Sequence, residues 1–166
     1  MTKTGKIKAG NSNKYTDKSR NSYAQFELLF LILFISVLLL DQLTKHLVRT
    51  YITSPVDIGL FTIVYTTNTG IAFSMLQNFP LIPAIVAILV ILLIFINRKS
   101  LLLDNLISIG FGLIAAGATG NLVDRFAFSR VTDFIDFHFW PVFNVADSAL
   151  TVGAIFLIIY FWKKQK

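Results

Sequence analysis

Four of the nine acidic residues in this chain lie in one stretch between two long apolar segments. The stretch runs from Gly117 to Ser148, reads GATGNLVDRFAFSRVTDFIDFHFWPVFNVADS and contains Asp124, Asp133, Asp136 and Asp147. An acid at the centre of a membrane helix costs about 2.5 to 3.5 kcal/mol on insertion scales. A group of acids among apolar segments therefore indicates a working site.

Two carboxylates from this group could act together on a peptide bond. When two carboxylates lie side by side they cannot both ionise easily, so one keeps a proton while the other serves as a base. Such a pair can activate water for amide hydrolysis. A helix that starts at Asn144 would favour the charged form of Asp147, so we expect Asp147 to be the base and Asp133 the acid.

The same acids also have ordinary structural explanations. Asp147 would occupy the third position of a helix capped by Asn144, where a carboxylate bonds back to the cap. Asp133 lies in the alternating run RVTDFIDF, which is typical of a strand or an extended loop. Asp133, Asp136 and His138 could be metal ligands, but the chain has no HExxH motif.

Other functions would use these residues differently. Ser148 and Lys45 could form a nucleophile pair, although nothing in the sequence fixes their distance. A small ion-coupled transporter could use buried acids as relay groups, in which case the acids would be spread through the middle of the membrane. A structural partner protein would need Asp147 only as a helix cap.

The composition places the chain in a membrane. Hydrophobic residues make up 55% of the 166 residues, which is too apolar for an ordinary soluble domain. The chain has no cysteine and two histidines, so we expect no disulfide, no metal and no cofactor. The formal net charge of +6 comes from lysines and arginines that flank the apolar segments, so we expect no nucleic-acid partner.

Four segments are each close to the length of about 20 apolar residues that a membrane span needs. The sequence predicts spans that begin at Phe26, Leu81, Leu101 and Asn144 and extend to about residues 48, 96, 120 and 162. The fold class is therefore an all-α membrane protein, a four-transmembrane-helix bundle. We expect residues 1–24 to be a disordered basic cytoplasmic tail and residues 25–166 to form the membrane domain.

The segment from Tyr51 to Asn78 differs from the spans. It is rich in β-branched and aromatic residues, with turn signals at 68–70, and it is too irregular to cross lipid. We expect a small β-sheet or hairpin on the outer surface, followed by a short apolar segment that contains Phe73 and Met75.

The third span has small residues at intervals of four from Gly112 to Gly120, a pattern that lets a neighbouring helix approach closely. We expect this helix to carry Asn121, Asp124 and Arg125 to the point where it leaves the membrane.

Asp41 and Lys45 lie four residues apart and share a face of the first helix. They could form an interfacial ion pair with the lysine extended to the headgroups. Alternatively, both side chains point inward and orient the acidic cluster.

The basic segments predict how the chain crosses the membrane. The N-terminal tail, residues 97–99 and the C-terminal lysines all fall on one side of four spans, and positive charge is retained in the cytoplasm. Both termini are therefore expected in the cytoplasm, with residues 49–79 and 121–143 on the outer side.

Five motifs of this chain resemble the lipoprotein signal peptidase family, also called signal peptidase II, a bacterial membrane aspartyl endopeptidase. They occur in the family's order: DQLTK from Asp41, NTGIAF from Asn68, GNLVDR from Gly120, VTDFIDF from Val131 and FNVADS from Phe143.

The resemblance implies an enzyme of the cytoplasmic (inner) membrane with a small extracytoplasmic β-sheet and its active site at the extracytoplasmic face. It implies cleavage of diacylglyceryl-modified prolipoproteins on the N-terminal side of the lipidated cysteine, access from membrane lipid, and inhibition by globomycin-type cyclic peptides. It implies that Asp133 and Asp147 are the catalytic pair. Residues expected to shape the site or hold the substrate are Asp41, Lys45, Asn68, Gly117, Asn121, Asp124, Arg125, Asn144 and Ala146.

Overall fold

The computed structural model describes residues 12–69, 81–102 and 104–165. Within these residues the elements, in chain order, are α1 (Ser12–Tyr51), β1 (Val56–Asp57), β2 (Thr62–Asn68), α2 (Leu81–Leu101), α3 (Asn105–Phe128), β3 (Val131–Asp136) and α4 (Val145–Lys164). Among the described residues, four helices are long and apolar enough to cross a membrane, which confirms the predicted spans. The segment with Phe73 and Met75 lies outside the described residues.

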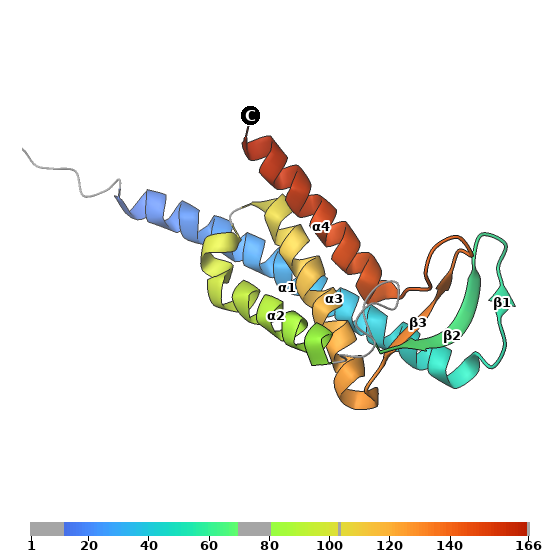
Figure 1. Cartoon of the computed structure of the whole chain (residues 1–166). Helices are drawn as coiled ribbons and strands as arrows, with labels where there is room; N and C mark the ends of the chain where they lie inside the picture. Colours follow the sequence, from blue (N-terminus) through green and yellow to red (C-terminus); the bar gives the residue numbers. More distant parts are fainter. Residues whose placement is uncertain (1–11, 70–80, 103, 166) are drawn as a thin grey trace, which may run out of the picture.

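Helix α3 is the centre of the bundle and packs against α1, α2 and α4 (Figure 1). Small residues on two of its faces make this possible. A methyl group added at Gly112 would lie 3.1 Å from the carbonyl oxygen of Phe30 in α1, and one added at Gly110 would lie 2.6 Å from a side-chain carbon of Leu157 in α4. The predicted small-residue ridge from Gly112 to Gly120 therefore faces α1, and a second small-residue face contacts α4.

The three strands described form an antiparallel sheet in the order β1-β2-β3, at one end of the bundle and away from the C-terminus of α4 (Figure 1). Strand β3 follows α3, and Asp133 pairs with Thr66 of β2. The strand that the alternating run predicted is thus confirmed, and it carries Asp133 into the sheet.

Helix α3 begins and ends later than the sequence predicted. The side chain of Asp104 caps its first turn by accepting from the backbone N–H of Leu106 at 2.6 Å. The helix continues past Gly120 to Phe128 and stops where Ser129 adopts the left-handed conformation, with φ of 59°. Its apolar composition ends at Gly120, but its polar side chains have buried partners and so the helix continues.

Two other helix boundaries differ from those that the sequence predicted. Helix α2 extends to Leu101 because Arg98 and Lys99 can occupy its last turn, where positive charge is favourable. Helix α1 begins at Ser12, so residues 12–24 are helical where a disordered tail was predicted. These residues contain neither glycine nor proline, and extending an existing helix costs less than starting one. Residues 1–11 lie outside the described residues, and the domain boundary at residue 25 stays a prediction.

Candidate active site

Carboxylates from four different elements meet at the end of the bundle that carries the sheet. They are Asp41 from α1, Asp124 from α3, Asp133 from β3 and Asp147 from α4. Asp41 and Asp124 are fully buried and Asp133 is 4% exposed, whereas Asp147 is half-buried. Acids this deeply placed need hydrogen bonds or opposite charges to remain ionised.

The N-terminus of α4 fixes the position of Asp147. The side chain of Asn144 caps the helix and accepts from the backbone N–H of Asp147 at 2.9 Å. In return Oδ2 of Asp147 accepts from the backbone N–H of Asn144 at 3.3 Å. The predicted cap is therefore present, and it leaves Oδ1 of Asp147 to accept from the Asn121 amide at 2.8 Å.

The same asparagine also contacts the second carboxylate. Nδ2 of Asn144 lies 2.6 Å from Oδ1 of Asp133, 3.1 Å from the carbonyl oxygen of Thr132 and 3.2 Å from Oδ1 of Asn121. Asp133 is thus bonded to the side chain of Asn144, and Asp147 is bonded to both the side chain and the backbone of that residue. The carboxylates of the two acids that the sequence paired thus both bond to one fully buried residue.

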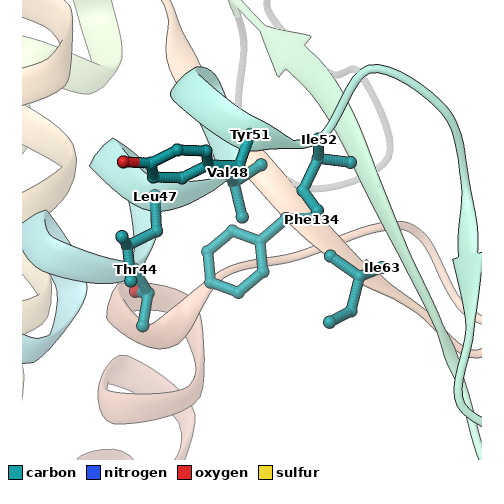
Figure 2. Close-up of a pocket in the computed structure, with 7 residues that line it drawn as sticks. All are labelled: Thr44, Leu47, Val48, Tyr51, Ile52, Ile63 and Phe134. Carbon is teal, nitrogen blue, oxygen red and sulfur yellow. The ribbon is translucent and has the colours of Figure 1, made fainter.

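Strand β3 directs the side chain of Asp133 toward Asn144 and the side chain of the next residue, Phe134, away from Asn144. Side chains alternate across a strand. Phe134 accordingly lies on the other face and lines an apolar pocket of about 370 Å³ with residues of α1 and β2 and the residue that follows α1, shown in Figure 2. The pocket lining is Thr44, Leu47, Val48, Tyr51, Ile52, Ile63 and Phe134. The burial of Phe134 holds the strand in the register that presents Asp133.

The surroundings of Asp133 favour its protonated form. Burial raises the pKa of Asp133 to about 7, and the nearby negative charge of Asp147 acts in the same direction. The hydrogen bond from Asn144 and the positive charges of Lys45 and Arg125 act in the opposite direction without reversing the shift. Asp133 can therefore hold a proton at a pH where an ordinary aspartate is ionised.

Lys45 joins the buried acids of α1 and α3. Its Nζ lies 2.9 Å from Asp41, 3.5 Å from Asp124 and 3.0 Å from Oδ1 of Asn121, and the lysine side chain is fully buried. The other oxygen of Asp41 accepts from the backbone N–H of Ala146 in α4 at 2.9 Å. Of the two explanations for Asp41 and Lys45, the structure supports the inward one.

The remaining predicted site residues lie around this group. Gly117 is placed directly against the carbonyl oxygen of Ala146, a contact too close for any side chain. Arg125 lies one turn after Asn121 in α3, and its positive charge acts on Asp133. Asn68 ends β2 and pairs with Val131 of β3, two residues before Asp133.

Asp136 does not join the cluster. Its carboxylate accepts from the backbone N–H of His138 at 2.7 Å and lies 3.5 Å from the His138 ring. In the part of the chain that the structure describes, no three histidine, cysteine or acidic side chains are placed to hold a metal ion. The hydroxyl of Ser148 donates to the carbonyl oxygen of Asn144 at 3.0 Å, as expected of a serine in a first helical turn.

Three polar residues that the sequence analysis did not single out also contact the site. Arg49 bonds to Asp124 and Thr132, and Gln42 donates to Asp41 at 3.0 Å and to the carbonyl oxygen of Gly120 at 3.1 Å. Arg49 could have been found, because positions 41, 45 and 49 form one stripe on α1. The sequence has no comparable signal for Thr132.

Comparisons with known proteins agree on one family. A family model described as signal peptidase (SPase) II matches residues 33–163. The lipoprotein signal peptidase of Halothermothrix orenii is 36% identical over 139 residues, covering 81% of this chain and 96% of that protein. The lipoprotein signal peptidase of Syntrophus aciditrophicus is 39% identical over 153 residues, covering 84% and 95%. A solved structure of a bacterial membrane enzyme has a TM-score of 0.73 and 28% identity, covering 82% of this chain and 89% of that one.

Replacing Lys45 tests whether the buried charges depend on one another. In Lys45→Met, two buried carboxylates lose their shared cation, and breaking a buried ion pair costs about 3 to 5 kcal/mol of unfolding free energy. Unfolding in detergent micelles measures the loss. Lys163→Met, at an exposed position near the end of α4, is the matched control. Adding Asp41→Asn to Lys45→Met should recover part of the loss. If Lys45→Met were as stable as the control Lys163→Met, the buried network would be contradicted.

Proposed function

This chain belongs to the signal peptidase II family, and from that premise we propose that Asp133 and Asp147 are the catalytic pair of a membrane aspartyl endopeptidase. The family is one of bacterial multi-pass membrane proteases. The substrate is a prolipoprotein whose cysteine carries a diacylglyceryl group, cut on the N-terminal side of that cysteine. The observation that carries the proposal is the pair of bonds by which Asn144 holds both carboxylates.

The two carboxylates divide the work of hydrolysis. Asp147 is ionised at the helix N-terminus and takes a proton from water, whose oxygen attacks the carbonyl carbon of the scissile bond. Asp133 gives its proton to the carbonyl oxygen as the tetrahedral intermediate forms. When the C–N bond breaks, Asp147 returns its proton to the leaving nitrogen and Asp133 regains one from the hydroxyl group. One water is consumed, and both acids end as they began.

The charges around the pair support a single shared proton. Four carboxylates and three cations lie in the cluster, so the fully ionised group carries a net charge of −1 (−4 + 3), and one added proton makes it neutral. Neutrality favours that state in a buried site, because an uncompensated buried charge is costly. The members of the group are Asp41, Asp124, Asp133, Asp147, Lys45, Arg49 and Arg125.

The supporting residues hold the pair in place. Asn121 and Asn144 orient the two carboxylates through their amides. Asp41 and Lys45 lock the N-terminus of α4 against α1 through the backbone of Ala146. Gly117 allows α3 and α4 to approach at this level. To Asn68 and Arg125 we assign the binding of the substrate backbone, because Asn68 pairs with Val131 near Asp133 and the charge of Arg125 acts on Asp133.

Aspartate-to-asparagine variants test the catalytic pair. Asp133→Asn and Asp147→Asn each remove one proton-transfer group, which contributes roughly 10²- to 10⁴-fold to the rate, so both should lose nearly all cleavage. Cleavage of a diacylglyceryl-modified precursor peptide is followed by gel shift, and a globomycin-type cyclic peptide should block the unsubstituted enzyme. Asp136→Asn is the matched control, because Asp136 contacts His138 instead of the pair. Near-normal cleavage by both variants, with the fold intact by circular dichroism, would refute the pair.

The pH dependence of kcat/KM tests the assignment of Asp133 as the acid. Asp133 holds its proton below a pKa of about 7 and loses it above, so kcat/KM should fall as the pH rises through about 7. Because the two carboxylates titrate as a unit, the midpoint of this fall in kcat/KM is a property of the pair and not of Asp133 alone. A decline centred near 3.8, the ordinary aspartate value, would contradict the assignment.

The orientation in the membrane follows from the same proposal. Both termini lie in the cytoplasm, and the sheet and active site lie at the extracytoplasmic face, where the acyl chains of the substrate remain in the lipid. Because the chain has no cysteine of its own, a single introduced cysteine is the one thiol that a maleimide can label. A membrane-impermeant maleimide should label Leu60→Cys, at a position 78% exposed before β2, in intact spheroplasts. It should label Lys164→Cys only after permeabilisation, and the reverse pattern would invert the proposed orientation.

A further inference from the structure

We propose that Arg49 is a positioning residue that sets the place of Asp133 by holding strand β3 at Thr132. The inference rests on the proposed function of Asp133. Arg49 is in the last turn of α1, and its side chain is 19% exposed, so it reaches the site from the rim of the bundle.

Arg49 and Asp124 hold a single residue of β3 by two separate bonds. Nη1 of Arg49 lies 2.9 Å from the hydroxyl of Thr132 and 3.3 Å from Oδ1 of Asp124. Oδ2 of Asp124 accepts from the backbone N–H of Thr132 at 2.9 Å. The strand is therefore held by its side chain and its backbone at the same position. Arg49 also lies over the ring of Phe128, 4.4 Å from its centroid, which restricts the guanidinium further.

The held residue directly precedes Asp133 and shares its hydrogen-bond donor. Nδ2 of Asn144 contacts the carbonyl oxygen of Thr132 at 3.1 Å and Oδ1 of Asp133 at 2.6 Å. A shift of Thr132 therefore changes the distance between Asp133 and the residue that joins it to Asp147. Displacements of about 1 Å at a catalytic group can cost roughly 10²-fold in rate.

The pairing of β2 and β3 is irregular on one side of Asp133. Between the pairs Ile63↔Ile135 and Thr66↔Asp133 the register of β2 and β3 shifts, so β2 has two residues opposite the single residue Phe134. A bulge of this kind interrupts the ladder and increases local twist. Beyond Asp133 the ladder resumes with the pairs Thr67↔Thr132 and Asn68↔Val131, and the bonds from Arg49 and Asp124 add a second constraint at Thr132 from α1 and α3.

Arg49 does more than balance the charge of Asp124. Lys45 already lies 3.5 Å from the carboxylate of Asp124. What Arg49 adds is its bond to the Thr132 hydroxyl, together with a planar group that can bond Asp124 and stack on Phe128. The role we assign is therefore geometric and depends on the guanidinium.

Substitutions at both ends of the Arg49–Thr132 contact test the role. Arg49→Met and Thr132→Val should each lower kcat roughly 10- to 100-fold while KM for the diacylglyceryl-modified peptide stays within about twofold. Thr132→Ser keeps the hydroxyl and should retain kcat, and Arg49→Lys, which keeps the charge without the planar group, should lose activity. Because Arg49→Met and Thr132→Val break the same contact, the double variant should be no slower than Arg49→Met alone. Arg130→Met, at an exposed arginine just before β3, is the control and should behave as the unsubstituted enzyme.

Three outcomes would overturn the inference. These are a kcat within about twofold of the unsubstituted enzyme in both Arg49→Met and Thr132→Val, an Arg49→Lys enzyme with full kcat, or losses that multiply in the double variant. If Arg49→Met fails to insert, the comparison of Thr132→Val with Thr132→Ser decides. Asp133→Asn is assayed alongside. If it is inactive while Arg49→Met is normal, only the positioning role fails, whereas an active Asp133→Asn would refute the proposed function itself.

Discussion

Each buried carboxylate in this protein needs a partner, and the packing of α1, α3 and α4 around the site satisfies that need. Asp41 and Asp124 share Lys45, and Asp41 also accepts from the backbone of Ala146. Separating the helices at this level would leave a charge without compensation. Elsewhere the bundle packs through apolar contacts such as Phe30 against Phe95, but lipid is as apolar as those rings and competes with them. The polar contacts therefore specify how the helices are arranged.

At the N-terminus of α4 the atoms that cap the helix are also the atoms to which we assign a catalytic role. A capping side chain stabilises a helix by about 0.5 to 2 kcal/mol through its oxygen. In Asn144 that oxygen accepts from Asp147, which leaves the amide nitrogen to bond Asp133. A serine or aspartate could cap the helix equally well but has no such nitrogen. The capping explanation for Asp147, which the sequence offered as an alternative to a working site, is thus part of the same arrangement.

The sequence predicted the structural features that depend on neighbouring residues in the chain. Apolar length predicted the spans, and the alternating run predicted the strand of Asp133. Strand alternation also assigns Asp136, three residues on, to the opposite face, so its exclusion from the cluster could have been derived. The end of α3 could not be predicted in this way, because its last turns carry polar side chains whose buried partners come from other elements. The bond from the Thr132 N–H to Asp124 likewise exists only once β3 has folded back on α3.

The position of the site at one end of the bundle follows from the supply of backbone donors. In the middle of a membrane helix every N–H is bonded within the helix, and none remains for an acid. Here the free N–H groups at the start of α4 bond Asp41 and the Asn144–Asp147 cap, and the N–H of Thr132 bonds Asp124. These donors exist only where a helix begins or a strand turns back. A group of acids able to share one proton can therefore be assembled at such an end, beside the lipid that would hold an acylated substrate, and not at the centre of the bundle.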